Sequence, residues 1–171
     1  MGSLDSQYKD GSYVPEGVGL LISILVRYPE VCSVRYLKQE HALKFRFLLQ
    51  VPENGEKLTK KIREALEVFH RFEGNTMQLC EVEQKPEDRL SLLMITRDVG
   101  SMSQREVGLI VDLVKAEWSK QLIFEEAELS EDELIFQEEV ISQILQSFRE
   151  SSLDKGFIAV REEGRVLVYK N

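Results

Sequence analysis

The chain has 171 residues, 43% of them hydrophobic and 30% charged, a balance typical of a folded globular protein. A chain of this length buries enough surface to fold without disulfides or bound metals. Its formal net charge of -8 argues against a nucleic-acid-binding role for the whole molecule. Because no apolar run reaches the roughly 18 residues that cross a bilayer, we expect a cytoplasmic protein without a membrane span.

The start of the chain predicts a helix and a hairpin after a flexible lead-in. Residues 1–14 are polar and show no apolar periodicity. From Glu16 to Tyr28 apolar residues recur at helical spacing, and Pro29 ends that helix because it cannot donate the next backbone hydrogen bond. Residues 31–38 and 42–50 alternate between apolar and polar, which predicts two antiparallel strands.

The alternation in this hairpin also predicts which side chains face the core. Tyr36, Phe45 and Phe47 fall on one face of the strands, whereas Lys44 and Arg46 fall on the other. We therefore expect the aromatic rings to be buried and the cations to point outward.

A second helix and two further strands are predicted next. Apolar residues from Leu58 to Phe72 lie on one stripe, and Gly74 follows where helices commonly end. Residues 76–84 alternate imperfectly, and residues 85–88 have the chemistry of a turn. Residues 90–96 are almost continuously apolar, which favours a strand at the centre of the sheet.

Two capping boxes predict the last two helices. Ser103 with Glu106 opens one and Ser130 with Glu133 opens the other, since Ser accepts from a free backbone amide and Glu reaches back to the cap. Between these helices, residues 122–124 suit either a helical extension or a short strand, and both remain open.

The chain ends in a predicted hairpin, residues 157–161 and 166–169, with Gly164 at the turn. The order predicts an α+β protein, in which helices pack on one face of an antiparallel sheet of hairpins. The part from Glu16 to Gln84 resembles a ferredoxin-like unit that lacks its first strand. We expect a main domain over 15–128 and a C-terminal helix-hairpin appendage over 129–171, packed on that domain.

Residues that carry chemistry are scarce in this sequence. His41 and His70 are the only histidines, and neither belongs to a short cluster of metal ligands. Cys32 and Cys80 each lie in an apolar, strand-like run and are expected as small buried hydrophobes. We therefore expect no catalytic residues, no metal and no cofactor.

The best candidate for a small-ligand site is the loop that follows the buried strand. There a glycine- and serine-containing segment opens a helix, and free amides at a helix start attract anions. The candidate anion-binding residues are Arg97, Gly100, Ser101, Ser103 and Arg105. In the alternative interpretation Ser103 only caps the helix, Gly100 turns the chain, and Arg97 forms a surface pair with Asp98.

Charge is distributed unevenly along the chain. Residues 1–75 hold 11 Lys and Arg against 10 Asp and Glu, or +1, and residues 76–171 hold 11 against 20, or -9. A basic face is predicted on and just after the first hairpin. Its candidate residues are Arg35, Lys44, Arg46, Lys60 and Lys61.

This charge distribution supports two functional hypotheses. The first is a non-enzymatic protein-interaction or regulatory module that self-associates, with a homodimer as the expected state. The second is a nucleic-acid-binding module that uses the basic face, although base stacking needs exposed aromatic rings and here they are expected inside. A small-anion-binding enzyme at the loop 97–105 is a third, weaker hypothesis.

Overall fold

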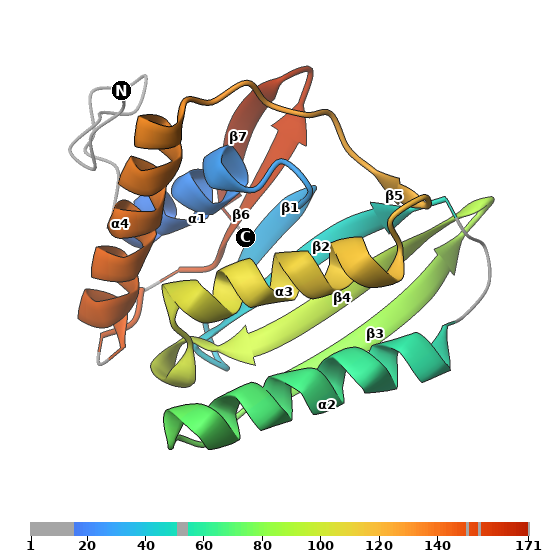
Figure 1. Cartoon of the computed structure of the whole chain (residues 1–171). Coiled ribbons are helices and arrows are strands. Elements are labelled where there is room, and N and C mark those ends of the chain that lie inside the picture. The colour runs from blue at the N-terminus through green and yellow to red at the C-terminus, as the bar shows by residue number, and fades with distance from the viewer. Residues whose placement is uncertain (1–15, 51–54, 150, 154, 171) are drawn as a thin grey trace.

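A computed structural model describes residues 16–50, 55–149, 151–153 and 155–170 (Figure 1). The flexible lead-in predicted for residues 1–14 lies outside them. The described elements, in chain order, are α1 (Glu16–Arg27), β1 (Ser33–Leu37), β2 (Ala42–Leu49), α2 (Glu56–Glu73), β3 (Cys80–Glu87), β4 (Leu90–Asp98), the short 3-10 helix η1 (Val99–Ser101), α3 (Gln104–Glu117), β5 (Leu122–Ile123), α4 (Glu131–Phe148), β6 (Phe157–Glu162) and β7 (Arg165–Lys170).

The strands form one antiparallel sheet in the order β3-β4-β2-β1-β6-β7, and β5 pairs with the end of β2. Figure 1 shows the four helices on one side of this sheet. The predicted α+β class, with helices packed on one face, is therefore confirmed. β4 lies between β3 and β2. This is the position of the first strand in a ferredoxin-like sheet, so a strand from later in the chain occupies the place of the strand that the part from Glu16 to Gln84 lacks.

The core lies between the helices and one face of the sheet. Val34, Phe45, Ile95 and Ala159 stand in one cross-strand row on that face, and all four are fully buried. The helices contribute their apolar stripes to the same core, with Leu21 and Leu25 of α1, Ile62 and Leu66 of α2, Ile110 and Val114 of α3, and Ile141 and Ile144 of α4. The predicted burial of the hairpin's aromatic rings is also correct, since Tyr36, Phe45 and Phe47 are all buried.

The C-terminal residues are built into the same sheet. β6 pairs with β1, and the guanidinium of Arg161 donates to the backbone carbonyls of Leu25 at 2.6 Å and Val31 at 3.2 Å. Burial lowers the pKa of Arg161, and its cation lies where the carbonyls at the end of α1 need donors. The predicted appendage thus joins the main part of the chain through strand pairing and through this cap.

The structure corrects two predictions about strands and settles a third point. β3 begins at Cys80 and includes Pro86, so the expected turn at residues 85–88 is wrong and the chain reverses at Asp88 and Arg89. Proline is tolerated there because β3 lies at the edge of the sheet. Residues 122–123, for which helix and strand were both open, form the short strand β5.

The turn of the last hairpin offers a test of backbone strain. Glu163 and Gly164 both have positive φ, 49° and 76°, as a two-residue type I′ turn requires. We expect Glu163→Asn to raise the free energy of unfolding by about 1 kcal/mol, because Asn adopts this conformation at lower cost than Glu. Urea unfolding measures the change, with Glu162→Asn as the control in the strand. A variant that is no more stable than the wild type contradicts the assignment.

Candidate functional site

A cluster of buried charged groups lies between α2, β4 and α3. It consists of His70, Arg97, Asp98 and Glu106, and we call it the buried charge cluster. Arg97 and Glu106 are fully buried, while His70 and Asp98 retain only 3% and 6% of their exposure. Charges this deep in a protein are stable only when they are paired and hydrogen-bonded.

Arg97 uses its donors within the protein. Its Nε and Nη2 both donate to the carboxylate of Glu106, with Nη2–Oε1 at 2.9 Å. Nη1 donates to the Leu79 carbonyl at 3.0 Å and to Asp98, and Nη2 also donates to Ser101 Oγ at 3.0 Å. The paired bonds to Glu106 have the two-pronged geometry that makes such pairs strong.

The Asp98 carboxylate joins the cluster to the loops on either side of β4. It accepts from the backbone amides of Gln78 and Leu79 and from the Ser101 hydroxyl. Burial raises the pKa of Asp98, but the hydrogen bonds from Ser101 and Leu79 and the charge of Arg97 outweigh it, so the pKa lies below its usual value.

Both histidines are held by hydrogen bonds. His70 Nε2 lies 2.6 Å from Glu106 Oε1, and its Nδ1 bonds to the side chain of Asn75. His41 lies half-buried in the turn between β1 and β2, where its ring bonds to the Tyr36 hydroxyl at 2.8 Å and to the Phe148 carbonyl at 3.0 Å. Neither ring has a nitrogen left over for proton transfer.

The candidate anion-binding residues do not converge on one open site. Ser103 caps α3 as predicted, by accepting from the Glu106 amide at 3.3 Å. The Glu106 carboxylate does not return to that cap as the capping box predicted, because it binds Arg97 instead. Arg105 is exposed and pairs with Glu73 at 3.0 Å, and Gly100 lies on the surface. The anion site stays a prediction that these contacts do not favour.

A hollow of about 270 Å³ beside the cluster has Cys80, His70 and Asn75 in its lining. Burial raises the pKa of the Cys80 thiol to about 11, so the thiol stays protonated at neutral pH. A catalytic cysteine needs the opposite shift, together with a base that is free to accept its proton. These three residues are therefore of the types found in a nucleophilic site, but they lack the lowered thiol pKa and the free base that such a site needs.

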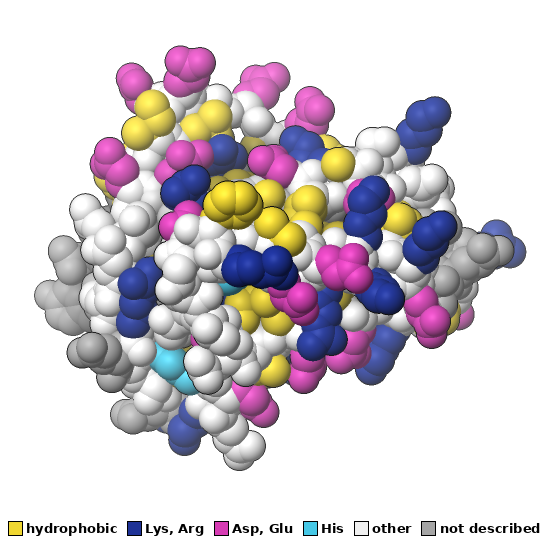
Figure 2. Space-filling model, turned by 60° about the horizontal axis from the view of Figure 1, so that its bottom comes forward, with side chains coloured by type: hydrophobic (Ala, Val, Ile, Leu, Met, Phe, Trp, Pro, Cys, Tyr) yellow, Lys and Arg dark blue, Asp and Glu magenta, His cyan; other side chains and the backbone are white. Residues whose placement is uncertain are grey.

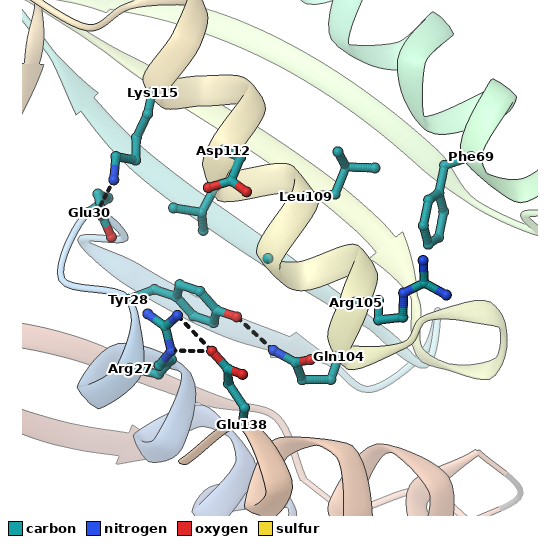
Figure 3. Close-up of a pocket in the computed structure, with 12 residues that line it drawn as sticks. Arg27, Tyr28, Glu30, Phe69, Gln104, Arg105, Leu109, Asp112, Lys115 and Glu138 are labelled. Carbon is teal, nitrogen blue, oxygen red and sulfur yellow. Dashed lines mark hydrogen bonds and ion pairs between the residues drawn. The ribbon is translucent and has the colours of Figure 1, made fainter. Parts of the chain in front are cut away.

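A second hollow, of about 550 Å³, opens between α1, α3 and α4 (Figure 3). Figure 3 shows two ion pairs in its lining, Arg27 with Glu138 and Lys115 with Glu30, while Arg105 and Asp112 also line it. Gln104 donates to the Tyr28 hydroxyl at 2.8 Å, and burial raises the pKa of Tyr28 to about 12. Because three cations and three carboxylates line it, this hollow favours neither an anionic nor a cationic ligand.

The predicted basic face is split between two layers of the molecule. Arg35, Lys44 and Arg46 lie on the outer face of the sheet, opposite in register to the core-facing residues. Lys60 and Lys61 lie on α2, on the helical side, where Lys61 pairs with Glu117 at 2.8 Å. Figure 2, which brings the α2 side forward, shows Lys and Arg side chains interleaved with Asp and Glu. The five residues do not form one surface.

The outer face of the sheet, which we call the open face, has no described helix over it (Figure 1). The cations Arg35, Lys44 and Arg46 lie at its centre, and none of them forms an ion pair with a described carboxylate. The Nε atoms of Arg35 and Arg46 are buried without a hydrogen-bond partner among the described residues. The flanking outer-face residues are apolar on β6 and β7 (Ile158, Val160, Leu167, Tyr169) and acidic on β3 (Glu81, Glu83).

In comparisons with known proteins, no family model, curated protein or solved structure matches the chain. Within the described ranges, no three His, Cys, Asp or Glu side chains come together as a metal site. No described helix combines the length and the apolar composition that crossing a membrane requires.

The buried charge cluster predicts a large cost for removing one partner. We expect Glu106→Gln to lower the free energy of unfolding by about 3–5 kcal/mol, because it leaves the Arg97 cation buried without its main partner. Glu67→Gln, at the exposed pair with Arg63, is the matched control and costs at most about 1 kcal/mol. Urea unfolding measures both. A Glu106→Gln variant no weaker than the control contradicts the assigned pairing.

The lowered pKa of Asp98 predicts a contribution to acid sensitivity. A carboxyl whose pKa is lowered by folding stabilises the protein at pH values above its ordinary pKa of 3.8. This contribution is lost as the pH falls below that value. We expect Asp98→Asn to be less stable than the wild type at neutral pH, and the difference to shrink toward acid pH. Urea unfolding of both proteins across this range tests it, and a difference that does not vary with pH overturns the assignment.

Proposed function

We propose that this protein is a non-enzymatic protein-interaction module that self-associates and binds an acidic, partly apolar protein surface through the open face of its sheet. The observation that carries the proposal is the group of three cations at the centre of that face, which have no carboxylate partner among the described residues.

The positions of these cations favour an anionic partner. Arg35 stands directly opposite Lys44, and Arg46 is two residues further along the same face of β2. Like charges at opposed positions destabilise a sheet, so the isolated protein bears a cost that a bound carboxylate group would relieve. Cations held on neighbouring strands are also already ordered, which lowers the entropy cost of binding.

The surroundings of the cations favour protein over nucleic acid. Ile158, Val160 and Tyr169 offer apolar contacts beside the charges, and Tyr169 keeps 51% of its exposure. On the other side, Glu81 and Glu83 of β3 share the face and would repel a phosphate backbone. The three aromatic rings of the first hairpin point into the core, so they cannot stack on bases.

The arrangement of the reactive side chains supports a role other than catalysis. Cys80 has a raised pKa, and the two ring nitrogens of His70 are bound to Glu106 and Asn75. Perturbed groups in an active site are expected to face a cavity with a free proton acceptor or nucleophile. Here the thiol beside the hollow stays protonated and both nitrogens of His70 already have partners, so an enzyme centred on the loop 97–105 is the least supported alternative.

Nucleic-acid binding remains a second candidate because unpaired cations attract phosphates as well as carboxylates. Only three cations contribute, however, and the formal net charge of the chain is -8.

The like-charge arrangement gives a test that needs no partner. We expect Lys44→Glu to raise the free energy of unfolding by about 0.5–1 kcal/mol, because it replaces a like-charge pair with Arg35 by an opposite-charge pair. Lys85→Glu is the matched control on the same face, where Glu83 and Glu87 are its neighbours along β3, and it gives no gain. Urea unfolding measures both. A loss of stability in Lys44→Glu shows that the lysine already has a favourable partner.

Binding is tested with two labelled probes, a synthetic peptide of alternating Glu and Leu and a single-stranded RNA of mixed sequence. By fluorescence polarisation we expect the peptide to bind, more weakly as salt rises, and the Arg35→Gln, Lys44→Gln, Arg46→Gln variant to lose at least about tenfold in affinity. The double variant Lys60→Gln, Lys61→Gln is the control and binds as the wild type does. Binding of RNA alone supports the nucleic-acid candidate, and binding of neither probe contradicts the proposal.

A further inference from the structure

The two edges of the sheet differ in how they are protected against pairing with another strand. β3 at one edge carries alternating charges and Pro86, features that natural edge strands use to prevent pairing. β7 at the other edge reads Arg-Val-Leu-Val-Tyr-Lys, with four consecutive apolar or aromatic residues and no proline. β7 pairs only with β6 among the described strands, so one side of it has no described neighbour.

The hairpin geometry identifies which backbone groups of β7 face this free edge. The Arg161 amide donates to the carbonyl of Cys32, the residue just before β1, so alternate residues of β6, beginning with Glu162, have their amides and carbonyls directed toward β7. The closing pair Glu162–Arg165 of the two-residue turn fits this pattern. On β7 the amides and carbonyls of Val166, Val168 and Lys170 therefore point away from β6.

A second copy of β7 fits this edge when it runs antiparallel with Val168 opposite Val168. Val166 of each strand then stands opposite Lys170 of the other, and every free amide and carbonyl of these three residues finds a partner. The same register places Leu167 opposite Tyr169 on the open face, an aliphatic–aromatic pair of the kind that stabilises sheets. A register shifted by one residue aligns Arg165 with Lys170 and no longer matches the free backbone groups.

We propose that two copies of this chain pair through β7 in this register and form one continuous sheet about a twofold axis at Val168. The pairing closes on itself, because both β7 edges are used and both β3 edges are protected, so it ends at a dimer and does not continue into fibres. This pairing identifies β7 as the contact surface for the self-association in the proposed function. It does not depend on the cations of the open face.

The test compares variants at the free edge by sedimentation velocity. Wild type sediments as a dimer, Val168→Thr remains one, and Val168→Pro becomes a monomer. Proline at this position removes an amide that faces outward and spares the bonds to β6. The triple glutamine variant of the open face stays dimeric, which separates this inference from the peptide-binding proposal. A wild type that is monomeric at every concentration overturns the inference, as does a dimer that survives in a folded Val168→Pro.

Disulfide trapping decides the matter where the proline variant fails to fold. Under mild oxidation Val168→Cys forms a covalent dimer across the twofold axis, because residues that are directly opposed in a hydrogen-bonded pair are close enough for a disulfide. Tyr169→Cys is the matched control, since its two copies stand two residues out of register and are too far apart. The wild type, with Cys32 and Cys80, gives the background. Trapping of Tyr169→Cys but not of Val168→Cys, or of neither, contradicts the pairing.

Discussion

A β-sheet has two faces and two edges, and a stable protein must cover, pair or make polar each of the four. In this protein the helices cover one face, and apolar rows such as Val34, Phe45 and Ile95 meet them there. The β3 edge is made polar by charges and Pro86. What remains is the open face, whose cations have no carboxylate partner within the described ranges, and the apolar edge of β7. The proposed interactions both follow from this unequal protection.

The covered face is held in place by charge as well as by apolar contact. The buried charge cluster joins α2, β4 and α3: Glu106 of α3 binds both Arg97 on the strand and His70 on α2. Such a cluster tolerates few arrangements, because each charge needs its partner at hydrogen-bond distance. Its side chains are therefore committed to the fold, and neither proposed interaction depends on them.

Local patterns predicted the parts of the fold that depend on local chemistry. Alternation placed Phe45 and Phe47 in the core, and Ser103 was identified as a helix cap from its spacing to Glu106. Glu106 was predicted to bind back to the cap, which is wrong. A glutamate at this position can bind either a helix cap or a buried arginine, and only the tertiary structure shows that Glu106 binds Arg97.

Long-range placement was beyond the sequence. Lys60 and Lys61 were grouped with Arg35 because they follow it closely in the chain, yet α2 packs on the opposite side of the sheet. The two edge strands could not be recognised either, since strand order is set by pairing between distant segments. Once the order is known, the charges and Pro86 of β3 and the apolar run of β7 are plain in the sequence.

Residue-resolved amide hydrogen exchange at high and low protein concentration tests the unequal protection of the sheet most directly. We expect the amides of Leu167 and Tyr169, which face β6, to exchange slowly at both concentrations. Those of Val166 and Val168 exchange slowly only at high concentration, where a second strand covers them. Rapid exchange of Val166 and Val168 at both concentrations would contradict this expectation, because the edge would then stay open to water.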